Sequence, residues 1–305
     1  MKKSVGRLLA VLFLLFLILN PSLSAKGAAD GLALWGNAVV PALLPFMIGT
    51  GVVVGLQATD LLIRPVFPIL KRFFGLSSDG AFVMVCGLLC GYPMGAKLDG
   101  EFLNGGRISL RQSRYLLAIC SHPSPMFLLG YTAAQLKEAG TGNCALPLLA
   151  SVYLPIFLLS FLSKKRYGWT SAPTKNIPPP SKTAPFSFDR HMMSSFETMI
   201  RIGGYIMLFS IASAYLEHFL SSPVVSAVLM GILEITTGIR ALCASMPTKA
   251  CLPLTAAAVS FGGLSGIFQV KSVLKNPELS IRDYVLWKCL HGVLSGILMT
   301  IFLRF

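Results

Sequence analysis

Charged side chains are scarce in this sequence, and acidic ones especially so. Only 12% of the 305 residues are charged, and 12 Asp or Glu stand against 26 Lys or Arg, whereas a soluble domain carries roughly 25% charged residues. Hydrophobic residues make up 54% of the chain, and its mean hydropathy is +0.71. The composition excludes an ordinary soluble domain and predicts an all-α integral membrane protein.

The residue patterns that carry enzymatic chemistry are also missing. The sequence has no nucleophile–base pair, no phosphate-binding loop and no metal-ligand spacing, so we expect neither an enzyme nor a cofactor. The seven cysteines lie mostly in or beside apolar segments and imply no disulfide framework. The net charge of +14 is divided among short basic clusters between apolar runs. That pattern is typical of cytoplasmic loops rather than of a nucleic-acid-binding surface.

The first half of the chain alternates apolar spans with basic loops. Residues 8–19 are either a signal peptide or, as we prefer, an uncleaved first helix. A second span covers 32–56 and ends in a basic segment that we place at the cytoplasmic interface. Two further crossings are expected at 115–133 and 145–162.

Residues 80–97 begin like a membrane helix and then break. The stretch CGLLCGYPMGAKL places Gly91, Pro93 and Gly95 inside an apolar segment, and basic loops that we assign to the cytoplasmic side flank it. This predicts a re-entrant hairpin that enters the membrane and returns. Non-helical backbone at membrane depth is tolerated only where it is packed in protein or lines a watery cavity. The breaks therefore predict a site.

The second half repeats this plan with opposite orientation. Spans are expected at 196–216 and 284–303. Between them lie a hairpin at 224–242, which holds Glu234 and a Thr-Thr-Gly break at 236–238, and a broken span at 252–269. Secondary transporters are built from such inverted repeats with broken helices, and they hold substrate near the bilayer midplane. The predicted organisation is an N-terminal helix at 1–25, a first repeat at 26–163, a cytoplasmic linker at 164–190 and an inverted second repeat at 191–305.

Five motifs carry a family resemblance. They are PALLPFMIG at 41–49, GYPMGAK at 91–97, SHPSPMFLLG at 121–130, GILEITTG at 231–238 and FGGL at 261–264. On these motifs the chain resembles the sporulation integral membrane proteins of the YlbJ type, which carry the nucleoside-recognition or Gate domain. His122 departs from this pattern, where an asparagine is expected. The resemblance implies a fold like that of concentrative nucleoside transporters and the movement of dipicolinate from the mother cell across the outer forespore membrane.

Residues at the helix breaks are the candidate substrate ligands. A broken helix directs backbone N–H groups and a positive helix end into a cavity, which suits the two carboxylates of dipicolinate. Glycine allows close backbone approach, Lys97 would add a positive charge, and Tyr92 would stack on the pyridine ring. The candidates are Gly91, Tyr92, Pro93, Gly95, Lys97, Ser121, His122, Ser124, Glu234, Thr236, Thr237, Ser260, Gly262 and Gly263.

Structural interpretations of these residues stay open. Lys97 can snorkel to the interface, Tyr92 can be an interfacial tyrosine, and His122 can bond to backbone groups freed by the neighbouring prolines. Glu234 is the sharpest candidate, because an ionised carboxylate inside a bilayer costs several kcal/mol. It can couple transport to a proton or sodium, gate the site, or pair with a basic residue such as Arg240 or Lys97.

The expected partners are membrane lipids and a small anionic substrate, without nucleic acid, and a homo-oligomer stays open. The expected location is the mother-cell-derived outer forespore membrane, as a multi-pass protein. Two alternatives remain. One is a transporter of nucleosides or another small solute, and the other is a non-transporting membrane scaffold needed for spore formation. We interpret His291 on the last span as a packing residue, because no broken backbone lies beside it in sequence.

Overall fold

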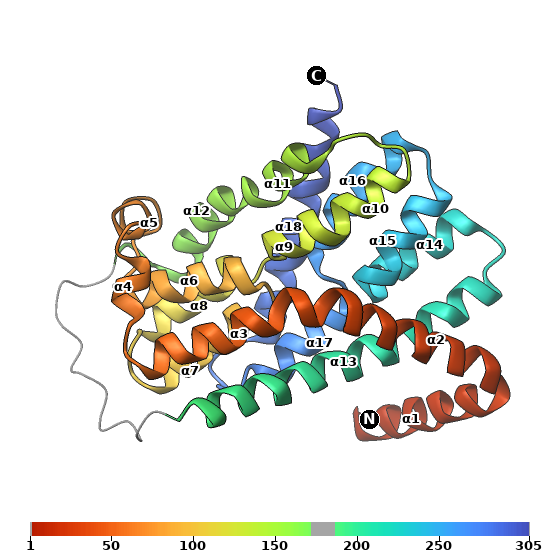
Figure 1. Cartoon of the computed structure of the whole chain (residues 1–305), viewed down its shortest axis with the longest axis horizontal. Helices are drawn as coiled ribbons and strands as arrows, with labels where there is room; N and C mark the ends of the chain where they lie inside the picture. Colours follow the sequence, from red (N-terminus) through yellow and green to blue (C-terminus); the bar gives the residue numbers. More distant parts are fainter. Residues whose placement is uncertain (1, 172–186, 305) are drawn as a thin grey trace.

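The computed structural model describes residues 2–171 and 187–304, and every regular element in these ranges is a helix (Figure 1). Five helices in the described ranges are long and apolar enough to cross a membrane. They are Pro21–Gly55, Ala145–Tyr167, Phe188–Phe219, Thr248–Val273 and Ile281–Phe302. The prediction of an all-helical membrane protein is confirmed. Most of the predicted linker, at 172–186, lies outside the described residues.

The N-terminal helices are longer than predicted. They are α1 (Lys2–Leu19), α2 (Pro21–Leu34), a π-helical turn (Trp35–Val39) and α3 (Val40–Gly55). The predicted span at 32–56 is therefore the second half of a helix that begins at Pro21, where Asn20 caps the new start through the Leu23 N–H. In Figure 1, α1 folds back beside α2.

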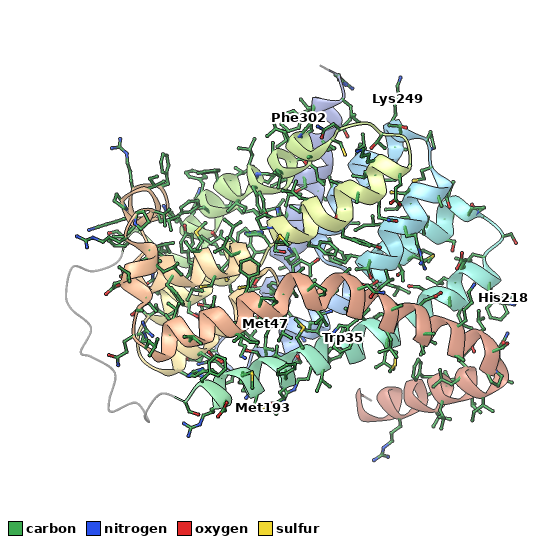
Figure 2. All side chains as sticks on the ribbon, in the orientation of Figure 1. Trp35, Met47, Met193, His218, Lys249 and Phe302 are labelled. Carbon is green, nitrogen blue, oxygen red and sulfur yellow. The ribbon has the colours of Figure 1, made fainter. Side chains whose placement is uncertain are left out.

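Helix α13 (Phe188–Phe219) lies along α2 and α3 (Figure 1). Trp35, labelled in Figure 2, joins them, because its indole Nε1 donates to the carbonyl oxygen of Met199 at 3.1 Å. Gly203 makes room for the ring, since a Cβ added there would lie 2.8 Å from a ring carbon. These contacts fix the long helix of the second half against that of the first half.

A helical hairpin, the first hairpin, follows two short helices. The four elements are α4 (Thr59–Ile63), α5 (Phe67–Phe74), α6 (Ser78–Cys90) and α7 (Met94–Asn104). Gly75 ends α5 in the left-handed conformation and Ser77 caps α6 through the Gly80 N–H, so the chain bends by 99° between these helices. Gly91, with φ of 78°, ends α6 and opens the predicted break.

The crossing predicted at 115–133 is an interrupted helical segment, which we call the first broken span, and it is not among the five long apolar helices. It consists of α8 (Leu110–Ile119), an irregular stretch at 120–124, α9 (Pro125–Phe127), a π-helical turn (Leu128–Thr132) and α10 (Ala133–Glu138). The half then closes with α11 (Ala145–Tyr153) and α12 (Pro155–Tyr167). Pro123 and Pro125 lack the N–H that a helix needs, which accounts for the break.

The second half also holds a long helix, a hairpin and an interrupted span. After α13 come α14 (Pro223–Leu233), α15 (Ile235–Ser245), α16 (Thr248–Phe261), α17 (Gly263–Val273) and α18 (Ile281–Phe302). Glu234, in an extended conformation, separates α14 from α15, which form the second hairpin. Gly262 and Gly263, both with positive φ, separate α16 from α17, which form the second broken span.

Large apolar side chains remain exposed on the outer helices. Leu146 is 76% exposed, Phe161 66%, Ile200 66% and Val293 58%. Exposed apolar surface of this extent is costly in water and suits contact with lipid tails. The exposed side chains thus agree with a multi-pass protein whose outer faces meet the membrane.

Candidate functional site: a cavity at four helix breaks

A central cavity lies where the four helix breaks meet. It holds about 480 Å³ of atom-free space, counting its open mouth. Each break contributes to the wall: Gly91 and Tyr92 from the first hairpin, Ser124 from the first broken span, Glu234 and Thr236 from the second hairpin, and Gly262 from the second broken span. The rest of the wall is mostly apolar: Val39, Ala42, Leu43, Pro123, Phe127, Ile202, Ile206, Ile235, Gly266 and Gln269.

The first hairpin is held to both broken spans. The Tyr92 N–H donates to the His122 carbonyl oxygen at 3.1 Å. This amide is therefore bonded within the protein. The Tyr92 ring packs over the second broken span, since Cβ atoms added at Gly262 and Gly266 would lie 3.5 and 3.4 Å from it. The Tyr92 hydroxyl is buried and has no hydrogen-bond partner within the described residues.

Glu234 caps the second half of its own hairpin. Its side chain is 1% exposed, and Oε2 accepts from the Thr237 N–H at 2.9 Å, from the Thr237 hydroxyl at 3.1 Å and from the Thr236 hydroxyl. A carboxylate at a helix N-terminus is favoured by the helix dipole. The local backbone therefore stabilises the charge that the sequence placed in the membrane.

Neither predicted basic partner pairs with Glu234. Arg240 lies 4.0 Å from Asp30 instead, and Lys97 donates to the hydroxyls of Ser194 and Thr198 at 3.2 and 3.1 Å. No Lys or Arg in the described ranges forms an ion pair with Glu234. The carboxylate thus faces the cavity wall with hydrogen bonds and without a countercharge.

Two predicted ligands, Gly95 and Lys97, do not line the central cavity. A Cβ on Gly95 would lie 2.0 Å from the carbonyl oxygen of Cys120 and 3.1 Å from the Cα of Gly87. Gly95 therefore serves helix packing and gives no substrate approach to the backbone. Lys97 sits one turn into α7, so the helix directs it toward α13. Both residues are corrections to the predicted ligand set.

Lys97 lines a second cavity, which we call the polar cavity. It has about 540 Å³ of atom-free space, counting its mouth. Its walls come from α7, α13 and the C-terminal end of α17: Lys97, Gly100, Glu101, Asn104, Ser194, Glu197, Thr198, Arg201, Val273 and Lys275. Arg201 and Glu197 form an ion pair there. Both cavities share α13 and α17 as walls.

Most of the other predicted ligands lie behind the wall of the central cavity. Ser121, His122, Thr237 and Ser260 are buried, but the wall does not include them. The His122 Nε2 lies 2.7 Å from the Ile119 carbonyl oxygen. That oxygen would accept a helical N–H from Pro123, which has none. His122 therefore bonds to backbone freed by a proline, as its structural interpretation predicts.

The remaining glycine and proline candidates have backbone roles. Pro93 is the N-cap position of α7, and no side chain caps that helix. Gly263 begins α17 with φ of 67°, and a Cβ there would lie 3.2 Å from the Leu233 carbonyl oxygen. Gly263 thus allows the second broken span to approach the second hairpin, although it lies outside the wall of the cavity.

Lys288 of the last span is not among the residues predicted from the sequence, and the sequence places His291 of the same span away from broken backbone. Lys288 is 3% exposed, and its Nζ donates to the Ser121 carbonyl oxygen at 3.1 Å and lies 5.5 Å from the centre of the Tyr92 ring. His291 packs edge-on against His122 with ring centres 4.8 Å apart, so it does lie beside broken backbone. A lysine within an apolar span is the same signal that singled out Glu234, and it could have identified Lys288.

Comparison with known proteins shows one similarity along almost the whole chain. The chain is 26% identical, over 96% of its length and 82% of the relative's, to the sporulation integral membrane protein YlbJ of Bacillus subtilis. This similarity supports a YlbJ-type assignment. No protein-family model and no solved structure matches the chain. Among the described residues, no group of three His, Cys, Asp or Glu side chains could hold a metal ion.

Proposed function

We propose that this chain is a transporter that moves a small organic anion through the central cavity. Its similarity to a sporulation integral membrane protein supports a YlbJ-type assignment. The proposed substrate is dipicolinate, and the proposed membrane is the outer forespore membrane. The observation that carries the proposal is the meeting of all four helix breaks at one cavity. Broken helices around a cavity are the means by which transporters hold a solute at membrane depth.

The two halves support an inverted-repeat interpretation. Each has a long helix, a hairpin, a broken span and a further helix, in that order. In each hairpin the two helices also contact each other through a pair of glycines. A Cβ on Gly95 would lie 3.1 Å from the Gly87 Cα, and one on Gly238 would lie 2.3 Å from the Gly231 Cα. The same packing device in both hairpins suits two copies of one unit, as in concentrative nucleoside transporters.

Differences among the helix starts after the breaks favour an anion. Glu234 occupies the N-terminus of α15, whereas α7 and α17, which begin just after the cavity-lining residues Tyr92 and Gly262, have no side-chain cap. The positive ends of α7 and α17 are thus available to a ligand carboxylate, because the protein supplies none of its own there. The apolar wall would contact the faces of an aromatic ring.

The polar cavity suits the role of a vestibule. Compared with the central cavity, it lies nearer the start of α13 and the end of α17. That is the side of residues 97–114 and 164–190, which we place in the cytoplasm. The three cations of the polar cavity, Lys97, Arg201 and Lys275, outnumber its two carboxylates, Glu101 and Glu197. The net positive charge would raise the local concentration of an anion before it reaches the central cavity. Lys97 thus acts at the entrance in this proposal rather than at the binding site.

The membrane potential is sufficient to drive such a substrate outward. One elementary charge moved through about 100 mV is worth about 2.3 kcal/mol, so a dianion gains about twice that from an inside-negative potential. We expect proteoliposomes holding the purified chain to release dipicolinate when a potential is imposed, without a proton or sodium gradient. Release that requires either gradient would contradict the uncoupled mechanism, and no release above empty vesicles would contradict the transporter proposal.

A nucleoside transporter is the second candidate. The uncharged amide of Gln269 and the carboxylate of Glu234 line the same apolar cavity as Tyr92, and these groups suit hydrogen bonds to a neutral ring. Competition decides between the two: excess uridine or adenosine should leave dipicolinate release unchanged. Uptake of the nucleosides themselves, unaffected by dipicolinate, would favour this second candidate.

The proposed topology makes a separate prediction. Residues 97–114 and 164–190 should be cytoplasmic, and residues 134–144 and 243–250 external. In a cysteine-free background, single cysteines in these loops should react with a membrane-impermeant maleimide only from the assigned side. Finding 97–114 on the opposite face from 64–76 would make the first hairpin a full span and remove the inverted repeat.

A further inference from the structure

We propose that Lys288 is the countercharge for a carboxylate of the substrate in the central cavity, and so determines selectivity for anions. This role rests on the proposed transport function and concerns the recognition of the solute's charge. Lys288 belongs to the last span. Its side chain lies one layer behind the wall of the central cavity and contacts three of the four helix breaks.

The burial of Lys288 is the first observation. The side chain is 3% exposed and belongs to α18, a helix long and apolar enough to span the membrane. A lysine at such a place is costly and is retained where it meets a partner or a functional cavity. Its partners within the described residues are neutral or aromatic: the Ser121 carbonyl oxygen at 3.1 Å and the Tyr92 ring, whose centre lies 5.5 Å from Nζ.

The lack of a protein countercharge is the second observation. No carboxylate in the described ranges forms an ion pair with Lys288. Asp99 is also fully buried, yet it forms no ion pair with the lysine. A buried ammonium that lacks an anion is stabilised strongly by one that arrives with a ligand.

The position of Lys288 is the third observation. The Lys288 Cε would lie 3.7 Å from a Cβ on Gly262, and the Lys288 Nζ lies over the Tyr92 ring. Gly262 and Tyr92 both line the central cavity. The uncapped starts of α7 and α17 follow directly after these breaks. The ammonium thus lies on the side of the cavity formed by Tyr92 and Gly262.

Tyr92 separates the ammonium from the cavity and also carries an unused donor. Its buried hydroxyl has no partner within the described residues. A small rotation of the ring, into space that the glycines at 262 and 266 leave open, would bring a ligand carboxylate within reach of Lys288 and the hydroxyl together. The chemistry that fits is a small aromatic acid, with its ring against the apolar wall and a carboxylate toward Lys288.

The test compares a dianion with its neutral isostere on the purified full chain. Binding of pyridine-2,6-dicarboxylate and of pyridine-2,6-dicarboxamide is measured by calorimetry for the unaltered protein, Lys288→Met and Lys288→Arg. We expect the unaltered protein to bind the dicarboxylate at least about tenfold more tightly than the diamide, since a hydrogen bond to a charged group is worth about 1.5–3 kcal/mol. Lys288→Met should abolish this preference and Lys288→Arg should keep it.

Lys271→Met is the matched control, because it removes the same charge from an exposed position on α17. It should keep the preference for the dicarboxylate. Tight dicarboxylate binding by folded Lys288→Met would overturn this inference and leave the transporter proposal standing. Equal binding of both compounds by the unaltered protein would also overturn it, even if Lys288→Met does not fold. Binding of neither compound would count against the dipicolinate proposal itself and against Lys288 as its countercharge.

Discussion

Glu234→Gln is expected to reduce dipicolinate transport at least about tenfold while the protein stays abundant in the membrane. Glutamine keeps an oxygen that can accept from the Thr237 N–H, so the cap on α15 survives. The change removes the one carboxylate that lines the central cavity among the described residues. A carboxylate there repels an anion and helps it to leave the cavity. Removal of this charge should therefore favour retention of the anion over its release.

Binding and turnover should therefore separate in this variant. We expect equilibrium binding of dipicolinate by Glu234→Gln to be equal to or tighter than that of the unaltered protein, with slower efflux from proteoliposomes. Glu234→Ala is the companion variant, because it also removes the cap, at a cost of about 1 kcal/mol. Wild-type efflux by Glu234→Gln, together with destabilised Glu234→Ala, would show that the carboxylate serves only the helix start.

Gly95→Leu is expected to deplete the protein from the membrane rather than to block a correctly folded transporter. Its Cβ alone would lie 2.0 Å from the Cys120 carbonyl oxygen, a backbone atom that cannot turn away. Overpacking of a tight core contact costs typically about 1–3 kcal/mol. The sequence pattern had indicated substrate approach at Gly95, and that interpretation would leave abundance unchanged.

Alanine at two positions of α7 provides the control for this effect. Gly95→Ala should lower the melting temperature of the purified protein in detergent, whereas Gly100→Ala should keep or raise it. No atom lies within 4 Å of a Cβ at Gly100, and alanine favours a helix over glycine by about 1 kcal/mol. Equal melting temperatures for the two variants would contradict the packing role of Gly95.

The positions of the helix breaks were predictable, because they follow from local backbone chemistry. Gly91 and Gly262 adopt positive φ, which other residues avoid. Pro123 and Pro125 withhold N–H donors from the helix. The second hairpin is the exception: the sequence predicts its break at 236–238, whereas the structure places it at Glu234, which caps the helix that follows. Each effect depends on a few neighbouring residues, so the sequence alone indicated four breaks and an all-helical membrane protein around them.

The assignment of individual side chains to the cavity was less predictable. Lys97 stands four residues after Pro93, and helix geometry turns it toward α13 and the polar cavity. His122 stands next to Ser121 at a break, and the oxygen that lacks its helical donor holds the ring. Proximity in sequence to a break therefore did not identify which side chains line the cavity.

Composition and the glycine–proline pattern thus determined by themselves that the chain is an apolar helical membrane protein with breaks at 91–93, 121–125 and 262. The break predicted at 236–238 lies at Glu234 instead, because this carboxylate caps α15. Only the tertiary structure decided that these breaks surround one cavity and that Lys288 lies behind its wall. Lys288 is 167 residues from Ser121, whose carbonyl oxygen it bonds. A contact of that kind depends on how whole helices pack, whereas a break depends on the conformations open to its own few residues.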